Sequence, residues 1–279
     1  MRMTKWVNQK SGATFIAILS TILFLFPVYW MVITSIKPIN ELFAKPPTLF
    51  PNNPTFEPYI KNFIESQAML GYIGNSFIIS IGTLLLTLLL AAPCAYALAR
   101  LEIKGKTLLL LFLLSAQMLP NIMLAMPLFI LFSQINLINS FTALIVANTI
   151  FALPFAILVL RPYFLSVPSG LEGAAAIDGC NKFSTFWRII LPLVRPGLLT
   201  VGAFCFLFAW GDFLFALVLT TSEEYRPLTL GLYQFTGEYG IEWNNLLAVA
   251  TIGAIPIILI FMTLQKYIVS GITSGSMKD

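Results

Sequence analysis

The chain alternates long apolar runs with shorter polar segments. Six apolar runs stand out, at about residues 13–36, 72–98, 107–132, 141–160, 198–219 and 246–269. A helix needs about 20 mostly apolar residues to cross the hydrocarbon core of a bilayer, so each run predicts one span. The pattern therefore predicts an all-α integral membrane protein with six transmembrane helices.

Prolines and polar residues interrupt several of these runs. Pro27 predicts a kink in the first span. Pro120, Asn121 and Pro127 interrupt the third span, and Pro154 interrupts the fourth. A broken helix at membrane depth is tolerated only where its backbone faces protein or a water-filled cavity. We therefore expect these breaks to face other helices or an internal cavity.

Two polar segments are predicted to be external loops. Residues 37–70 hold six prolines and mixed charges, which makes the segment too polar for lipid and rich in turn signals. Residues 221–245 hold four glutamates and one arginine. The last predicted span follows this second loop and contains Pro256.

Residues 171–197 form the longest polar-flanked interruption of the apolar runs. Ser169 and Glu172 have the spacing of a capping box, which predicts a helix beginning there. Three alanines favour the helix over residues 171–178, and Gly179 supplies the left-handed stop that a helix C-terminus prefers. A short helix ending at Gly179 is the expected result.

A second short helix is predicted after that glycine. Asn181 can cap it. The spacing i, i+3, i+4, i+7 predicts one apolar face made of Phe183, Phe186, Trp187 and Ile190. Pro192 and Pro196 then disturb the helix and lead the chain into the next span. On these patterns alone, the two helices could also be a simple re-entrant elbow.

Composition supports the membrane class and excludes several functions. Of 279 residues, 58% are hydrophobic and 10% are charged, against about 25% charged in soluble domains. The chain has no histidine, and its three cysteines have no CxxC spacing, so no metal site or disulfide framework is expected. It also has no GxxxxGK[ST] loop, so any nucleotide-driven activity would need a separate subunit.

Basic residues are distributed unequally between the two sides. Of 16 Lys and Arg residues, twelve lie in the segments predicted to be inside: Arg2, Lys5, Lys10, Arg100, Lys104, Lys106, Arg161, Lys182, Arg188, Arg195, Lys266 and Lys278. The other four lie in the predicted outside loops: Lys37, Lys45, Lys61 and Arg226. The positive-inside rule therefore predicts a multi-pass protein of the cell membrane with both termini cytoplasmic. The net charge of +4 follows from this topology, and no nucleic-acid partner is expected.

The polar interruption resembles the cytoplasmic loop of the permease subunits of ATP-binding-cassette importers. The signature of that family is Glu-Ala-Ala, three residues, Gly, nine residues and Ile-x-Leu-Pro. At this spacing the chain has Ala174, Ala175, Gly179, Ile189, Leu191 and Pro192. Gly173 holds the glutamate position, and Glu172 stands one place earlier, which is about 100° around a helix.

The resemblance covers nearly the whole chain and points to the carbohydrate branch, similar to the G-type permeases of maltose transporters. It rests on Pro27 with Thr34, Ser35 and Lys37; Asn75 and Ser76; residues 95–100; residues 177–179; Trp210, Asp212 and Phe213; and residues 271–278. It implies a type I importer fold with cytoplasmic coupling helices and a non-catalytic subunit without a cofactor. It also implies a second permease subunit, two cytoplasmic ATPase subunits that bind ATP and Mg, and an extracytoplasmic sugar-binding protein.

The resemblance assigns a cytoplasmic N-terminus to residues 1–12, the permease domain to 13–269, its coupling loop to about 162–197, and a cytoplasmic tail to 270–279. The resemblance assigns ATPase docking to Glu172, Gly173, Ala174, Ala175, Asp178 and Gly179, and to Thr273, Ser274 and Lys278 of the tail. We expect four residues to anchor the loop to its own membrane domain: Phe183, Phe186, Trp187 and Pro192.

Candidates for the substrate pathway are polar or aromatic residues within the spans: Gln117, Asn121, Asn148, Trp210 and Asp212. Asp212 is the only acid well inside a predicted span, where a charge costs about 2.5 to 3.5 kcal/mol. It could serve transport, or it could lie near the interface or pair within a subunit contact. Gln117, Asn121 and Asn148 could equally make interhelical contacts.

Other functions remain as alternatives. An importer permease could carry amino acids, peptides or polyols instead of sugars. An integral-membrane enzyme would need a cluster of nucleophile, base or metal ligands, which a chain without histidine hardly offers. A self-sufficient secondary transporter or channel would need intramembrane ionisable groups or a filter-like sequence.

Overall fold

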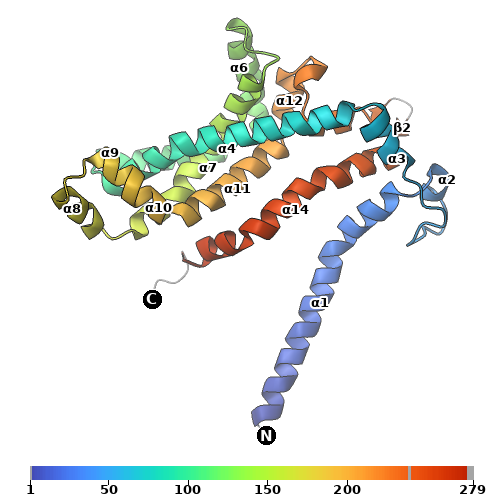
Figure 1. Ribbon diagram of the computed structural model, residues 1–279, viewed down its shortest axis with the longest axis horizontal. Coiled ribbons are helices and arrows are strands. Elements are labelled where there is room, and N and C mark those ends of the chain that lie inside the picture. The colour runs from blue at the N-terminus through green and yellow to red at the C-terminus, as the bar shows by residue number, and fades with distance from the viewer. Residues whose placement is uncertain (1, 238–239, 275–279) are drawn as a thin grey trace. The chain divides into compact units, whose positions relative to one another are not determined.

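The computed structural model describes the backbone of residues 2–237 and 240–274 and the side chains of residues 12–237 and 240–265. Figure 1 shows its helices and strands in chain order of colour, and the chain divides into two compact units. Unit 1 comprises Met1–Met69 and Leu232–Ile255, and unit 2 comprises Leu70–Gly231 and Pro256–Asp279. Both units are built almost entirely of helices, which confirms the predicted fold class.

Unit 1 begins with the long helix α1 (Arg2–Ser35). The helix continues through Pro27 and starts before the predicted span at residue 13, because the polar residues ahead of the span join the same helix. Its apolar side chains are exposed within this single chain, with Phe24 at 78% and Leu23 at 69%. Such exposure is expected of a helix whose surroundings are lipid or another membrane protein.

The segment after α1 is less irregular than its prolines predict. It contains helices α2 (Ile39–Leu42) and α3 (Glu57–Tyr59) and the π-helix η1 (Ile60–Glu65). Buried Asn62 in η1 donates a hydrogen bond from Nδ2 to Asn245 Oδ1 at 3.0 Å. Unit 1 also holds a hairpin of two short strands, β1 (Thr236–Gly237) and β2 (Gly240–Ile241), which pair antiparallel.

Unit 2 contains three long helices: α4 (Ala68–Arg100), α7 (Phe141–Ser166) and α11 (Arg195–Trp210). Their shared core uses many small side chains, including Ala91 and Ala95 of α4 and Ala152 and Ala156 of α7. Small residues let helix backbones approach closely, which drives packing where lipid removes the hydrophobic effect. One close approach is at Gly197 of α11, where an added Cβ would lie 2.5 Å from the Tyr163 ring of α7.

The prediction of a break at Pro154 is wrong. Helix α7 continues through both Pro154 and Pro162 to Ser166. A proline removes one backbone hydrogen bond, and neighbouring helices can compensate for that loss in a membrane protein. The helix therefore includes Arg161, whose Nε donates to the Leu98 carbonyl at 3.3 Å.

The predicted third span is broken, as expected. Helices α5 (Lys106–Gln117) and α6 (Asn121–Gln134) meet at 96° across Pro120. The predicted fifth span is also broken, which the sequence interpretation missed. Helix α11 ends at Trp210, and the separate helix α12 (Leu214–Leu219) follows and contacts α6 and α7.

The remaining elements are short, apart from the final helix. Unit 2 holds α8 (Gly170–Ile177), α9 (Lys182–Thr185), the π-helix η2 (Phe186–Ile190), α10 (Leu191–Leu193) and the 3₁₀ helix η3 (Glu223–Tyr225). Helices α13 (Leu228–Tyr233) and α14 (Trp243–Ser274) extend from one unit to the other along the chain. Helix α14 continues through Pro256.

Membrane-crossing length can be assessed over the described residues. Four helices are long and apolar enough to cross a bilayer, in the ranges Gly12–Ser35, Ala68–Arg100, Phe141–Ser166 and Trp243–Gln265. Two bent pairs, α5 with α6 and residues 182–193 with α11, raise the number to six if each pair is one span. The predicted multi-span architecture is therefore confirmed as four to six candidate spans.

Candidate functional site

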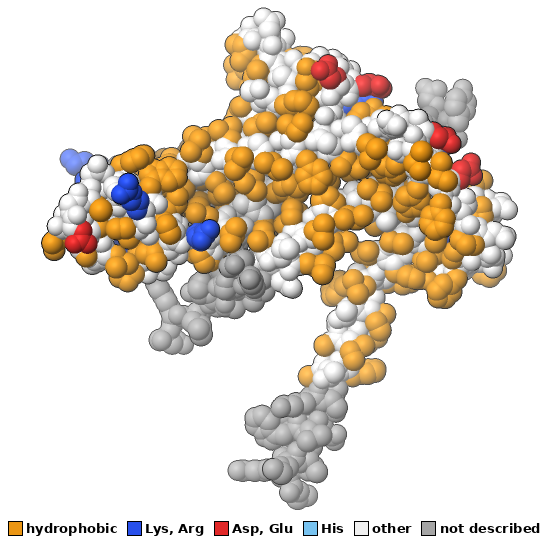
Figure 2. All heavy atoms as spheres, in the orientation of Figure 1, with side chains coloured by type: hydrophobic (Ala, Val, Ile, Leu, Met, Phe, Trp, Pro, Cys, Tyr) orange, Lys and Arg blue, Asp and Glu red, His pale blue; other side chains and the backbone are white. Residues whose placement is uncertain are grey.

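The first candidate site is the elbow formed by α8 and α9, which lies at one end of unit 2 (Figure 1). Lys and Arg side chains gather at this end, on the face shown in Figure 2. Gly179 joins the two helices with a φ of +81°, and the Cys180 N–H donates to the Ala175 carbonyl at 2.9 Å. Since only glycine adopts this conformation without strain, the predicted helix stop is confirmed.

The predicted capping box at the start of α8 is wrong. Ser169 has helical backbone angles, φ −64° and ψ −27°, and makes no side-chain capping bond in the described structure. A capping residue normally has extended angles that aim its oxygen at the first-turn N–H groups. Because Ser169 already lies in a turn that begins at Pro168, its side chain does not cap the helix.

Glu172 instead connects α8 to the end of α4. Its Oε1 atom lies 2.8 Å from Arg100 Nε, and its Oε2 atom accepts from the Tyr96 hydroxyl at 3.4 Å. Arg100 Nη2 also donates to the Val167 carbonyl, just before α8. The Nε–Oε1 contact has the distance of an ion pair without the angle of a directed hydrogen bond. These contacts hold α8 against the C-terminal end of α4.

The faces of α8 differ from the expected docking surface at one position. Gly173 and Ala174 are exposed, as docking requires, and Ile177 is 88% exposed. Ala175 is only 2% exposed, so its assignment to the docking face is wrong. Ala175 points to the side on which α8 packs against its own chain, about 100° around the helix from Ala174. Asp178 follows the helix and is exposed.

The second helix of the elbow is capped as predicted, since Asn181 Oδ1 accepts from the Ser184 N–H at 2.8 Å. The prediction of one aromatic face is wrong. Phe186 is buried at 7% exposure, whereas Phe183 and Trp187 are 73% and 45% exposed. The π-helix η2 begins at Phe186 and turns more slowly than an α-helix, which changes the face on which later residues fall.

Pro192 ends this elbow where the resemblance places it. It lies in α10, and the chain from residue 182 to 193 meets α11 at 78°. Phe186 packs close to Tyr96, with ring centroids 5.1 Å apart, and to Phe164 at 6.3 Å. Among the expected anchors, the contacts of Phe186 tie the elbow to α4 and α7.

The second candidate site is a cavity of about 420 Å³ beside the break between α11 and α12. Asn121, Asn148 and Asp212 line it together with aromatic and apolar side chains. Asn121 comes from the first turn of α6, after the break at Pro120, and Asn148 from the middle of α7. The structure therefore brings three of the predicted pathway residues to one cavity.

Asp212 has a defined structural role in this cavity. Its two carboxylate oxygens accept from the backbone N–H groups of Phe215 and Ala216, both at 3.2 Å. Asn148 Nδ2 donates to Asp212 Oδ2 at 3.4 Å. Asp212 thus caps α12 and faces the amide of α7, which places its charge against donors at the positive end of a helix.

The other two predicted pathway residues lie elsewhere. Trp210 is 4% exposed and stacks on Phe206 at 5.5 Å, which makes it a core residue of unit 2. Gln117 Nε2 donates to the Phe151 carbonyl at 3.4 Å, an interhelical contact between α5 and α7. These positions match the packing alternative for both residues.

The docking residues predicted in the tail lie outside the described side chains. Thr273 and Ser274 fall within α14, but their side chains are outside the described ones, and Lys278 lies outside the described residues. Among the side chains that the structure describes, no group of three His, Cys, Asp or Glu could hold a metal ion.

Family comparison assigns this architecture. Residues 88–274 match the family of binding-protein-dependent transport system inner membrane components. The match covers all three long helices of unit 2 in whole or part, the elbow and the Asp212 cavity. The chain belongs to this family. The permease is therefore an inner membrane component of an ATP-binding-cassette importer, and it is non-catalytic.

Named relatives cover nearly the whole permease. It is 37% identical over 254 residues to the sulfoquinovosyl glycerol transport system permease protein SmoH of Agrobacterium fabrum, covering 91% of this chain and 89% of the relative. It is 35% identical over 264 residues to the trehalose/maltose transport system permease protein MalG of Thermococcus litoralis, covering 94% of each. A crystal structure of a bacterial transporter that imports alginate has the same fold, with a TM-score of 0.79 at 20% identity over 95% of this chain and 97% of that one.

Sequence reasoning missed the contacts of Tyr96 and Arg100, two residues of α4 that hold the elbow, and the exposure of Ile177 in the elbow itself. The sequence analysis used Tyr96 and Ile177 only as part of the family resemblance. It used Arg100 for that resemblance and in the count of basic residues on the inside. A signal existed for Ile177, because a large apolar residue beside the exposed end of a short helix favours a partner surface. No local pattern pairs Arg100 with Glu172, since 72 positions in sequence separate them.

Proposed function

We propose that this chain is the permease subunit through which an ATP-binding-cassette importer moves a saccharide across the cell membrane. The observation that carries the proposal is the α8–Gly179–α9 elbow. It is held to α4 through Arg100 and Glu172, yet it leaves Gly173, Ala174 and Ile177 exposed. A rigidly held helix with a small exposed face suits close approach to a partner's groove. The names of the permease's relatives, which include sugar and glycoside transport systems, support the saccharide.

The proposed assembly contains a second permease subunit, two cytoplasmic ATPase subunits and an external sugar-binding protein. ATP and Mg would bind to the ATPase subunits, and this chain would need no cofactor. Closure of the ATPase pair would push on α8, and the attached α4 would transmit the movement into the membrane domain. Rocking of the permease halves would then alternate access to the pathway.

The proposed substrate pathway includes the Asp212 cavity. Breaks at Pro120 and Gly211 bring irregular backbone to this cavity, as in transporters whose sites lie between discontinuous helices. Asn121 and Asn148 have amide groups that can hydrogen-bond sugar hydroxyls, and Phe151 and Phe208 supply apolar walls. The lining is therefore suited to an uncharged, hydroxyl-rich solute.

The proposed topology places the N-terminus (1–12), the coupling loop (162–197) and the tail (270–279) in the cytoplasm, with the permease domain over 13–269. The excess of basic residues in these segments supports it. After replacement of the three native cysteines, an impermeant maleimide should label Ser222→Cys but not Ser184→Cys in intact cells. Equal labelling of both positions would contradict this topology.

The proposed tail contact with the ATPases has its own test. Deleting residues 274–279 should weaken ATPase coupling more than assembly, because the tail would touch the ATPases without forming the membrane domain. A deletion variant with unchanged transport would show that the tail is a frayed terminus.

The saccharide function is tested with the complete importer in proteoliposomes. Radiolabelled di- and oligosaccharides, a polyol and an amino acid are offered with the external binding protein, with and without ATP inside. ATP-dependent uptake of a saccharide alone is the expected result. ATP-dependent uptake of only the polyol or amino acid would overturn the saccharide class while leaving the importer class intact.

A further inference from the structure

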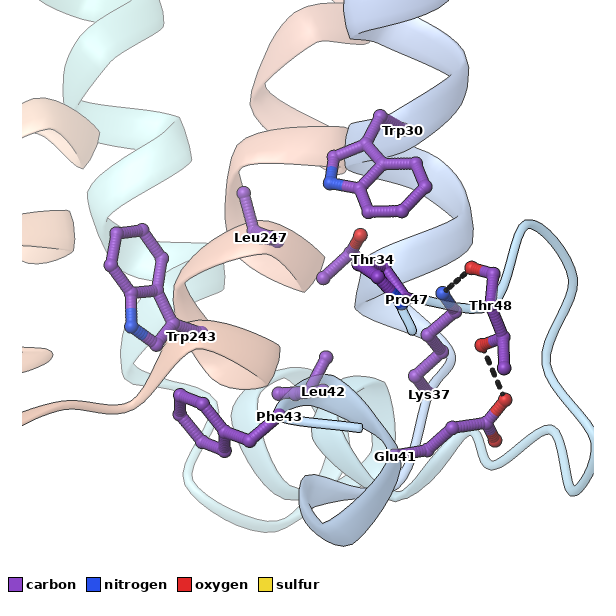
Figure 3. A pocket seen from close by; sticks show the side chains of 10 residues that line it. All are labelled: Trp30, Thr34, Lys37, Glu41, Leu42, Phe43, Pro47, Thr48, Trp243 and Leu247. Atoms are coloured by element: carbon purple, nitrogen blue, oxygen red, sulfur yellow. Dashed lines mark hydrogen bonds between the residues drawn. The ribbon is translucent and has the colours of Figure 1, made fainter. Parts of the chain in front are cut away.

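A cavity of about 330 Å³ lies in unit 1, apart from the Asp212 cavity. Figure 3 shows Lys37 and Glu41 in its wall. Lys37 Nζ donates to the Thr48 carbonyl, and Glu41 accepts from Thr48 Oγ1 at 2.8 Å. Because both charged groups bind their own chain, they do not identify a ligand for this cavity.

An apolar groove of about 220 Å³ lies in unit 2, between α4 and the segment that starts at Phe186. The described residues that line it are all Leu, Ala, Pro, Phe or Trp. Leu85 and Leu89 of α4 are each 60% exposed and Trp187 of η2 is 45% exposed, so the groove opens on the surface of the chain. Its side chains offer a polar group no partner except the indole N–H, so the lining suits a hydrocarbon group.

The groove lies at the depth of one leaflet of the bilayer. Its α4 residues, 85–93, precede Arg100 by 7 to 15 positions in the same helix. At about 1.5 Å per residue, they lie about 10 to 22 Å from the end of the helix. Each half of the hydrocarbon core is about 15 Å thick. The groove therefore faces the acyl chains of the leaflet on the Arg100 side, which is the cytoplasmic leaflet under the proposed topology.

The width of the groove fits an acyl chain rather than a helix. Its α4 wall, residues 85–93, is about 12 Å long. A volume of about 220 Å³ over that length leaves a cross-section of about 18 Å². An α-helix with its side chains is about 10 to 12 Å wide, so a helix of another subunit does not fit into the groove. A single unbranched hydrocarbon chain is narrow enough to enter.

The π-helix η2 lies at the end of the groove nearest the membrane surface. Its first residue, Phe186, packs on Tyr96 with ring centroids 5.1 Å apart, and Tyr96 lies about one turn before Arg100. The next residue, Trp187, lines the groove. Tryptophan is enriched at the level of lipid headgroups, because its ring is apolar and its N–H is polar. Trp187 therefore marks the end at which a headgroup would lie.

Two arginines stand beside this end of the groove. Arg188 follows Trp187 directly, and Arg195 lies three positions before the groove residue Leu198, on the same face of α11. Both arginines are exposed, and neither joins an ion pair within the described residues. Figure 2 shows Lys and Arg side chains next to hydrophobic surface at this end of unit 2. Unpaired cations beside apolar surface complement a negatively charged lipid headgroup.

We propose that this groove binds one acyl chain of an anionic phospholipid, whose headgroup lies at Arg188 and Arg195. The bound lipid would join α4, which forms one wall, to the end of the elbow, which supplies Trp187. The binding requires no saccharide, so it can fail while the importer function stands, and the reverse also holds.

The test is photocrosslinking of the assembled importer in nanodiscs of phosphatidylcholine. Trace phosphatidylglycerol or phosphatidylcholine carries a diazirine in one acyl chain, and mass spectrometry locates the adducts. The phosphatidylglycerol probe should label residues 85–93 and 187–198 more than the phosphatidylcholine probe does. This preference should fall about 3- to 5-fold in Arg188→Gln and in Arg195→Gln, because each basic residue near a membrane surface contributes about that factor to binding anionic lipid.

Two further variants accompany the arginine substitutions. The matched control combines Lys104→Gln and Lys106→Gln, which removes two basic residues around the start of α5 that do not line the groove. Leu89→Trp narrows the groove at an exposed position, so it should lower labelling by both probes.

Each outcome decides the proposal. A preference for phosphatidylglycerol that the arginine variants lose, the lysine variant keeps and Leu89→Trp weakens supports it. Equal labelling by the two lipids, or an equal loss in the lysine variant, overturns it in favour of ordinary boundary lipid. Absence of adducts in the groove overturns it in favour of a groove covered by another subunit. Saccharide uptake by the same proteins in proteoliposomes reports separately on the importer function.

Discussion

The Arg100 Nε atom lies 2.8 Å from the Glu172 Oε1 atom and joins the last residue of α4 to the first turn of α8. The side chains are 14% and 27% exposed, so solvent screens this ion pair only partly. We infer that Glu172 fastens the docking helix to its own chain. A glutamate at position 173 would point elsewhere, about 100° around the helix.

The ion pair predicts a measurable coupling between the two residues. Glu172→Gln and Arg100→Met should each increase hydrogen exchange of the α8 amides, and the double variant should add little. The expected interaction energy is about 1 kcal/mol, allowing for partial exposure. Ser169→Ala is the matched control, because Ser169 makes no described capping bond. Additive effects of the two substitutions would show that the pair does not hold α8.

Asp212 provides a prediction that separates capping from charge. Asp212→Asn should retain one of the two capping hydrogen bonds of α12, because an asparagine side chain keeps one acceptor oxygen, and should keep most transport activity. Asp212→Ala should increase amide exchange in α12, with a loss of about 0.5 to 2 kcal/mol, and should reduce transport. Measurement combines hydrogen exchange with uptake in proteoliposomes. If the asparagine variant loses transport while α12 stays protected, the negative charge itself is required.

Glu41 predicts a pH dependence in the segment that follows α1. Burial raises the pKa of Glu41, but the hydrogen bonds from Thr48 and Asn52 and the charge of Lys37 together lower the pKa below its ordinary value. The unfolded chain therefore takes up a proton more readily. The stabilisation is fully present above the ordinary glutamate pKa of about 4.3, and it is lost as the pH falls through the lower folded value.

Hydrogen exchange of residues 37–56, corrected for intrinsic rates, measures this loss. Wild-type protection should fall as the pH drops below about 4.3. At neutral pH, protection in Glu41→Gln should be weaker than in the wild type, and it should change less as the pH falls. Parallel pH profiles for the two proteins would refute a role for the Glu41 carboxylate. Glu57→Gln is the matched control in the same unit, since Glu57 is exposed.

Gly173 predicts a gain in the stability of the docking helix. It is exposed, and among the described atoms an added Cβ would meet nothing within 4 Å. Gly173→Ala should stabilise α8 by about 0.5 to 1 kcal/mol, because alanine is the better helix former. Gly173→Glu should also be tolerated, or should tighten the complex with the ATPases. Faster exchange of α8 amides in Gly173→Ala would contradict the exposed helical setting of this residue.

Local signals predicted the elbow well. The conformations of Gly179 and Asn181 depend on neighbouring residues in the chain. Gly179 has the predicted left-handed conformation, and Asn181 makes the predicted capping bond. The same reasoning failed where a distant partner decides. Glu172 turns to Arg100 rather than to its own helix N-terminus, and Ala175 faces its own chain.

Hydrophobicity located the spans, but it did not show where they break. Pro154 leaves α7 continuous, whereas α11 ends before Gly211, inside an apolar run. The carboxylate of Asp212 satisfies the first N–H groups of α12, so the chain can start a new helix there. Similarly, the spacing of the aromatic residues did not show which of them packs inward: Phe186 is buried, whereas Phe183 and Trp187 are exposed.

The docking role of α8 is tested most directly by Ala174→Trp. Ala174 is exposed on α8, so a large side chain can be accommodated in the permease but not at a close contact with an ATPase subunit. Ala68→Trp is the matched control, since Ala68 is also exposed and begins α4, far along that helix from Arg100. Both variants should insert into the membrane and assemble with the second permease.

The measurement is ATP hydrolysis by the purified importer, with and without its binding protein and sugar. Ala174→Trp should abolish the stimulation by the sugar-loaded binding protein, and Ala68→Trp should retain it. Full stimulation in Ala174→Trp would show that α8 is not the surface on which the ATPase docks.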